Sequence, residues 1–114
     1  MLEQNNAQTM FGLHRRFRAA AMGHLAAFEA TSSLPSRRMS QGLRRLELPE
    51  SLAHYYDEHV EADAVHEQVA VRAICVPMVE AEPHLLEDLF LGVFTCLDLE
   101  DRVARHLLAS WEAA

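Results

Sequence analysis

The sequence contains no lysine. All ten of its basic residues are arginine, and 17 acidic residues give the 114-residue chain a net charge of −7. Nucleic acids and anionic membrane surfaces bind clustered positive charge, so neither is an expected partner. The longest apolar stretch, residues 89–97, is far shorter than the roughly 20 residues of a membrane span. The first six residues are polar, so we expect no secretory signal.

Cysteine and glycine are also scarce. The two cysteines, Cys75 and Cys96, form no CxxC pair, and we interpret them as reduced thiols of a cytoplasmic protein. The four glycines lie far apart in the sequence, which excludes the glycine-rich motifs that bind phosphate groups. The sequence also lacks the GxSxG motif of serine hydrolases.

Signals for β-strands are nearly absent, while alanine, leucine, glutamate and arginine dominate, as is typical of helices. The length fits one domain or part of one. We therefore predict an all-α protein with Pro35 ending the first helix and Pro77 breaking or kinking the third. The expected helices cover residues 8–30, 36–46, 49–75 and 84–111.

The expected third helix carries most of the candidate metal ligands. At about 100° per residue, His59, Asp63 and His66 fall on its inward face. Burying a carboxylate is costly unless a positive group compensates it. Two imidazoles flanking a carboxylate suit iron, manganese or zinc, and the spacing is similar to that of ligands in helical di-iron proteins. The alternative is a solvated acidic helix whose histidines stand among many charges.

Glu29 on the expected first helix is the candidate partner of this set. It lies one turn after Leu25, near the edge of an apolar stripe. From there its carboxylate could bridge metal ions held by a neighbouring helix. The alternative is an ordinary charge near the end of a helix.

Three segments of the chain resemble one known family. They are FGLHRR at 11–16, GHLAAFE at 23–29 followed by TSS at 31–33, and YDEHVEADAVHE at 56–67. Together they look like the iron-containing redox enzyme family, which comprises the haem-oxygenase-like di-iron oxidases and oxygenases. The resemblance extends from about residue 9 to residue 111.

This resemblance implies a haem-oxygenase-like helical bundle that binds two non-haem iron ions in place of haem. In the family one core helix carries a His-x3-Asp-x2-His set, which His59, Asp63 and His66 match residue for residue. A further family ligand is an upstream glutamate, and Glu29 holds its place. The implied activity is an O2-dependent oxidation of a small organic substrate, whose identity cannot be read from the fold.

The family's remaining ligands come from helices that precede this region, so the chain looks like the C-terminal half of such a domain. Either a missing N-terminal half or a second copy in a homodimer would complete the site. We accordingly expect exposed apolar surface beside Met22, Leu25, His59 and His66. One alternative function is a non-catalytic helical fragment that binds metal or a partner. Haem binding is disfavoured, because Asp63 would place a charge beside the ring.

Overall fold

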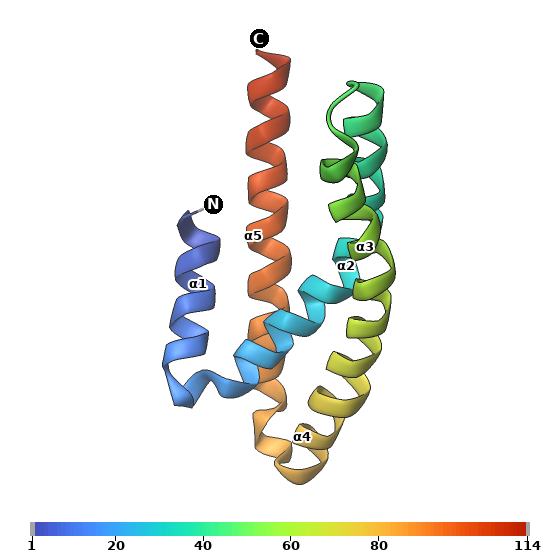
Figure 1. The fold of residues 1–114 in the computed structure, drawn as a ribbon. Coiled ribbons are helices and arrows are strands. Elements are labelled where there is room, and N and C mark those ends of the chain that lie inside the picture. Colours follow the sequence, from blue (N-terminus) through green and yellow to red (C-terminus); the bar gives the residue numbers. More distant parts are fainter. Residues whose placement is uncertain (1, 114) are drawn as a thin grey trace.

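The computed structural model describes residues 2–113, and over this range the protein is all-α, as the sequence predicts (Figure 1). Between these residues no helix is long and apolar enough to cross a membrane. The elements are α1 (Leu2–Leu13), a 3-10 turn (Arg15–Phe17), α2 (Arg18–Arg45), α3 (Glu50–Gln68), a π-helical segment (Val69–Cys75), α4 (Val76–Ala81), a 3-10 turn (Pro83–Leu85) and α5 (Leu86–Glu112).

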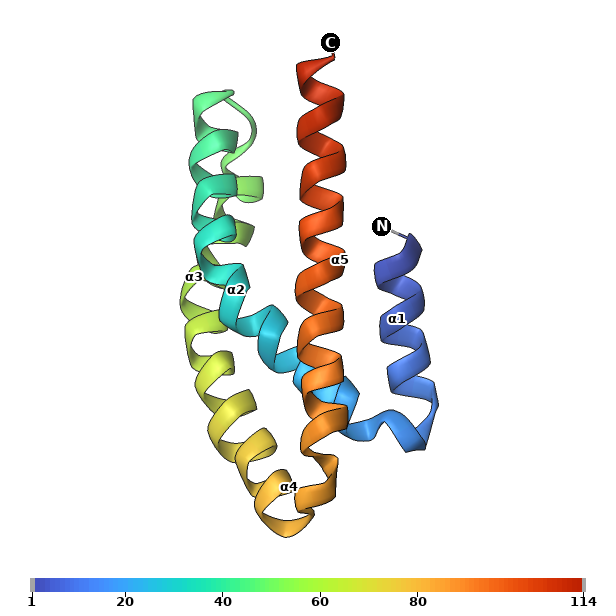
Figure 2. The same ribbon diagram turned by 180° about the vertical axis from the view of Figure 1, so that it is seen from behind.

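Helix α2 is the centre of the arrangement. Helix α3 packs along its second half and α5 crosses its first half, while α3 and α5 hardly contact each other (Figures 1 and 2). Helix α1 lies antiparallel beside α5, where Glu3 forms an ion pair with Arg102 at 2.6 Å. The fold therefore sets the middle of α2 directly against α3.

The prediction of one helix over residues 8–30 is wrong in its first part. The helix breaks at His14, whose backbone is extended (φ −104°, ψ 106°), and a 3-10 turn follows. The buried ring of Phe11 lies 5.9 Å from that of Phe17 and 6.0 Å from that of His24. Burial of an aromatic ring at this corner outweighs the helical preference of the local sequence and directs α1 back along α5.

The predicted end at Pro35 and the separate helix over residues 36–46 are also wrong, because α2 continues through the proline and bends (Figure 2). Proline kinks a helix because it removes one backbone hydrogen bond. Hydroxyl groups in the preceding turn form other bonds: Thr31 donates to the carbonyl of Ala27 at 2.8 Å, and Ser33 donates to that of Val60 in α3 at 3.2 Å. Contact with α3 thus keeps this part of the chain helical.

The predicted third helix is confirmed in extent, since α3 and the π-helical segment together reach Cys75. Of the two predicted effects of Pro77, a break does not occur: the regular α-helix gives way to the π-helical segment just before this proline, and Pro77 itself lies in the first turn of α4, where a missing N–H is tolerated. The helix ends instead at Glu82 (φ −135°, ψ 77°), the residue before Pro83. Helix α5 matches the predicted last helix within two residues at each end.

The core lies where α2 packs against α5 and the π-helical segment, and it consists largely of small side chains. A Cβ atom at Gly23 would lie 1.9 Å from the carbonyl oxygen of Leu89, and one at Gly92 would lie 1.9 Å from that of Ala20. The two backbones are therefore in direct contact, which only glycine permits. The buried apolar residues are Phe11, Ala19, Ala20, Ala26, Ala27, Ala53, Ala70, Cys75, Leu85, Leu89, Cys96 and Leu99.

A polar cluster joins the C-terminal end of α2 to the N-terminal part of α3. The guanidinium of Arg44 donates to Asp57 at 2.6 Å and also to Glu50, so it binds two carboxylates of α3. It further donates to the buried hydroxyl of Ser40 at 2.7 Å, and that hydroxyl donates to Asp57. These contacts fix how α3 lies on α2.

We expect the variant Arg44→Met to lose less stability in acid than the wild type. Hydrogen bonds from Arg44 lower the pKa of Asp57 and of Glu50. Groups with a lowered folded-state pKa contribute stability above their ordinary values of about 4, and that stability is lost as the pH falls through the lowered values. Urea unfolding at pH 7 and pH 3 measures the difference. Equal acid sensitivity in both proteins would contradict it.

The control for this experiment is Arg105→Met. Arg105 forms an ion pair with Asp101 at 2.7 Å, but both residues lie on α5, so the pair joins no two helices. An exposed pair of this kind contributes little to stability. The acid sensitivity of this variant should therefore equal that of the wild type.

Candidate metal centre

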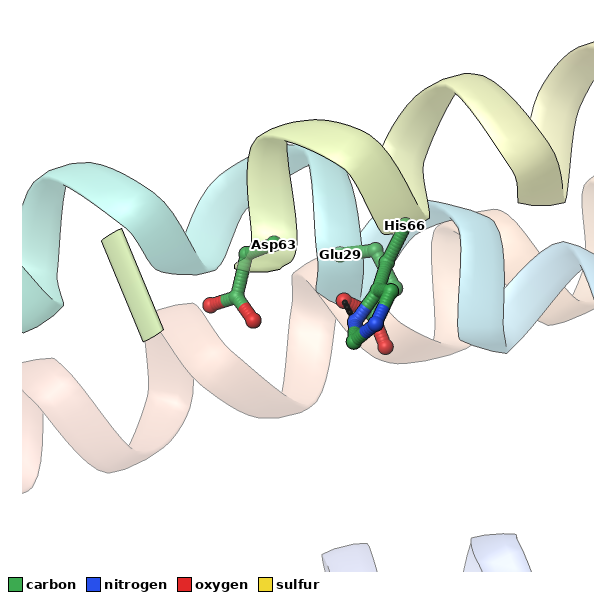
Figure 3. A group of neighbouring side chains, drawn as sticks. All are labelled: Glu29, Asp63 and His66. Carbon is green, nitrogen blue, oxygen red and sulfur yellow. Dashed lines mark ion pairs between the residues drawn. The ribbon is translucent and has the colours of Figure 1, made fainter. Parts of the chain in front are cut away.

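Three side chains that can bind a metal meet between α2 and α3. Glu29 comes from the middle of α2, and Asp63 and His66 come from α3, one helical turn apart (Figure 3). Each offers one ligand atom, and these atoms all lie within 4.8 Å of one another. The group therefore contains three of the four residues that the sequence singles out.

One carboxylate oxygen of Glu29 is buried and has no hydrogen-bond donor among the described residues. Its side chain is only 15% exposed, and Oε2 lies 3.3 Å from Nδ1 of His66. The two groups lie at ion-pair distance, but the contact is not a hydrogen bond, so within residues 2–113 this buried oxygen has no hydrogen-bond donor. Buried carboxylate oxygens are normally bonded, and a cation at this point would satisfy the atom.

Asp63 is buried, with 5% of its surface exposed. The hydroxyl of Ser32 lies 2.6 Å from its Oδ2 and 3.2 Å from the carbonyl oxygen of Glu29. One hydroxyl hydrogen donates to one acceptor at a time, and the shorter contact assigns it to the carboxylate. A single neutral donor does not balance a buried negative charge, so Asp63 also favours a nearby cation.

The two histidines of the predicted set are placed differently. His66 belongs to the group and keeps 57% of its side chain exposed. His59 lies outside the group: its Nδ1 is 2.7 Å from the carbonyl oxygen of Tyr55, and its ring packs on that of Tyr55 at 4.4 Å. With Nδ1 as the donor, Nε2 of neutral His59 is the nitrogen left for a metal.

His24 is the other imidazole near this part of α2. It is buried against the ring of Phe11 and is not part of the three-residue group. Loss of solvent around the ring lowers the pKa of His24, although the charge of Glu100 opposes this shift. His24 is thus held neutral, in a packing position.

A pocket of about 260 Å³ opens beside Glu29 and His66. Its other walls are apolar and come from two elements, with Leu25 on α2 and Val69, Ala70 and Ile74 on the π-helical segment. A π-helical turn is wider than an α-helical one and occurs frequently at functional sites. The arrangement places an apolar space directly next to the candidate ligands.

The donor set fits a first-row metal ion. Two carboxylates and an imidazole are hard to borderline ligands that suit iron, manganese or zinc. Among the described residues the buried oxygen of Glu29 has no hydrogen-bond donor, and this is the observation of the structure that favours a cation here. Neither cysteine belongs to the group, so the site has no thiolate character.

An all-α fold with a carboxylate–histidine group between two of its helices is typical of helical metalloproteins. The comparison with protein families gives the particular class: the model of the iron-containing redox enzyme family matches residues 1–101. The chain belongs to this family. No curated protein and no solved structure matches it.

Some features of the site have little signal in the sequence. Ser32 lies three residues after Glu29, on the same face of α2, but the Thr-Ser-Ser run favours a helix end when it is considered alone. Only the continuation of α2 through Pro35 places this hydroxyl on Asp63. The π-helical segment has no recognised sequence motif, and its apolar side chains resemble ordinary core positions.

Proposed function

We propose that the chain holds non-haem iron at Glu29, Asp63 and His66, with His59 as a fourth ligand, and that this centre performs an O2-dependent oxidation of a small organic substrate. One observation carries the proposal. In a chain of the iron-containing redox enzyme family, two carboxylates and an imidazole lie within 4.8 Å, and one buried carboxylate oxygen has no donor among the described residues. By the family resemblance the centre holds two ions.

The side chains around the centre have distinct roles in this proposal. Ser32 orients the carboxylate of Asp63 through its 2.6 Å hydrogen bond, as outer partners of metal ligands commonly do. Exposed His66 marks the open side of the centre, and Leu25 and Val69 offer an apolar surface for the substrate beside it. Bound iron would supply the redox chemistry with O2.

The thiols take no part in this chemistry. Both are free and buried, and burial raises the pKa of Cys96 to about 11. Burial also raises the pKa of Cys75, whose thiol lies 3.6 Å from the carbonyl oxygen of Met22. Protonated thiols are poor metal ligands and poor nucleophiles. Two buried, unpaired thiols support our proposal of a reducing, cytoplasmic environment.

Anaerobic titration with Fe(II), followed by desalting and iron determination, tests the site. We expect the wild type to retain iron and His66→Ala to bind it at least about tenfold more weakly, since loss of even an outer partner of a ligand costs that much. His54→Ala is the matched control, because His54 is an exposed histidine of α3 that faces Glu58 outside the group. Equal iron retention by His66→Ala and wild type would overturn the assignment.

Exposure of the loaded protein to O2 tests the oxidase activity. An iron-dependent uptake of O2, absent in His66→Ala, supports it. Retained iron without O2 uptake would instead favour the alternative of a non-catalytic metal-binding protein. A stoichiometric Soret band with haemin that is lost in His59→Ala would favour haem binding and contradict the non-haem centre.

A further inference from the structure

A second pocket, of about 200 Å³, opens at the corner between α1 and α2. It neighbours the pocket beside the candidate metal centre, because Leu25, which is exposed as the sequence predicts, lines both. An apolar cavity of about 150 Å³ is large enough to hold benzene, so this pocket has room for one aromatic ring. Its walls are mostly apolar and come from both helices: Phe11, Ala21, Leu25 and Phe28.

The imidazole of His24 belongs to the same wall and carries a polar atom without a partner. His24 is 7% exposed, and its buried Nε2 has no hydrogen-bond partner among residues 2–113. The neighbouring ring of Phe11, 6.0 Å away, packs edge-on against it. Buried polar atoms of folded proteins are nearly always hydrogen-bonded, so an exception calls for an explanation. The χ2 torsion of histidine is broad, and a turn of the ring brings Nε2 to a ligand held in the pocket.

The surroundings of His24 select a neutral ligand. Burial lowers the pKa of His24, so the imidazole supplies no positive charge to balance an anion, and the charge of Glu100 nearby also disfavours one. The described lining residues include no carboxylate, so a cation is not favoured either. Neutral imidazole has one donor and one acceptor nitrogen, and a hydroxyl group both donates and accepts. A hydroxyl therefore bonds Nε2 in either tautomer.

We propose that this pocket binds a small neutral aromatic alcohol of the size of phenol, with its ring against Phe11 and Phe28 and its hydroxyl on Nε2 of His24. Aromatic rings pack well on one another in edge and offset arrangements. Apolar walls with one polar group that fixes the orientation are the usual construction of a small-molecule site. None of the residues that form the candidate metal centre lines this pocket, so the site goes beyond the proposed function and needs no iron.

Titration of the metal-free full chain with phenol and with toluene, followed by NMR, is the test. The two probes share a ring, and only phenol has a hydroxyl. We expect phenol to bind the wild type with a Kd on the order of 1 mM. His24→Phe should weaken phenol about tenfold, the upper end for one neutral hydrogen bond, and leave toluene unchanged. The fold should tolerate this variant, because it replaces an unpartnered buried nitrogen with an apolar ring.

A second variant tests the place of binding. Gly12 of α1 lines the pocket, and a Cβ added there meets nothing within 4 Å in the described part of the chain. Gly12→Leu should therefore fold and fill the pocket, which weakens both probes at least tenfold. Gly42→Leu is the matched control, because a Cβ at Gly42 of α2 is equally unhindered and Gly42 lies outside the pocket lining. It should bind both probes as the wild type does.

The other possible results overturn the proposal. Phenol that binds His24→Phe or Gly12→Leu as tightly as the wild type does not occupy this site. Equal weakening of phenol and toluene in His24→Phe removes the hydroxyl contact. Benzoate that binds more tightly than phenol contradicts a neutral ligand, and a wild type that fails to bind phenol contradicts the site itself. Iron is absent throughout, so none of these results alters the case for the iron centre.

Discussion

Gly92→Ala is expected to destabilise the fold by about 3 kcal/mol or more, the upper end of the cost of overpacking. The new methyl group would lie 1.9 Å from the carbonyl oxygen of Ala20, and the contacting atoms are backbone, so no side-chain rotation relieves the clash. Helices α2 and α5 would have to move apart along their whole crossing. Domains of this size have a total stability of about 5–15 kcal/mol, so urea unfolding should show the loss readily.

Gly42→Ala is the matched control for this prediction. Gly42 also lies inside a helix, but a Cβ at this position meets nothing within 4 Å in the described part of the chain. Alanine should therefore stabilise the protein here by roughly 0.5–1 kcal/mol. A Gly92→Ala variant as stable as Gly42→Ala would contradict the close crossing of α2 and α5.

The same crossing predicts that a second alanine costs less than the first. Gly23 and Gly92 contact opposite backbones at one helix–helix crossing. Once the helices have parted to admit one methyl group, the other has room. The combined variant should therefore lose less stability than the sum of the two single losses.

The sequence predicts the long helices because their signals are local. Alanine-rich and leucine-rich stretches with an apolar stripe indicate α5 and α3 directly. The errors at His14 and Pro35 arise where contacts distant in the sequence decide the backbone. Burial of Phe11 bends the chain at one of them, and contact between Ser33 and α3 keeps α2 helical at the other. The need for glycine at position 92 could not be predicted either, because it depends on the backbone of Ala20, which is far away in the sequence.

Part of the candidate site could likewise be predicted from the sequence, and part of it could not. The spacing of Asp63 and His66 places both on one face of a helix, and that is visible in the sequence. Glu29 needs the resemblance as well, since nothing local distinguishes it from a surface charge. The structure brings these three together but turns the ring of His59 to the carbonyl of Tyr55. A single-helix pattern thus specifies a face, while the packing of α2 on α3 determines which ligand atoms meet.

Two aspartates of α3, Asp57 and Asp63, are expected to respond differently to replacement by asparagine. Asp57 is bonded to the Arg44 guanidinium, whereas Asp63 is buried with a single neutral donor, Ser32. Asp63→Asn should abolish iron binding, a loss well beyond the roughly tenfold to hundredfold cost of removing an outer partner of a ligand. In the metal-free protein the same change should raise stability by roughly 1–3 kcal/mol, because a buried charge disappears and the shape is kept.

Asp57→Asn is the internal control, because it should reverse the effect on stability and leave iron binding unchanged. It removes one half of an ion pair that joins α2 to α3, so the metal-free protein should lose stability while iron binding stays intact. Urea unfolding of the metal-free variants and iron retention after desalting give the four values. A metal-free Asp63→Asn that is less stable than the wild type would mean that Asp63 contributes to folding by itself. We expect instead that the buried carboxylate of Asp63 destabilises the metal-free fold and stabilises the iron-loaded one. Iron that binds the folded state stabilises that state.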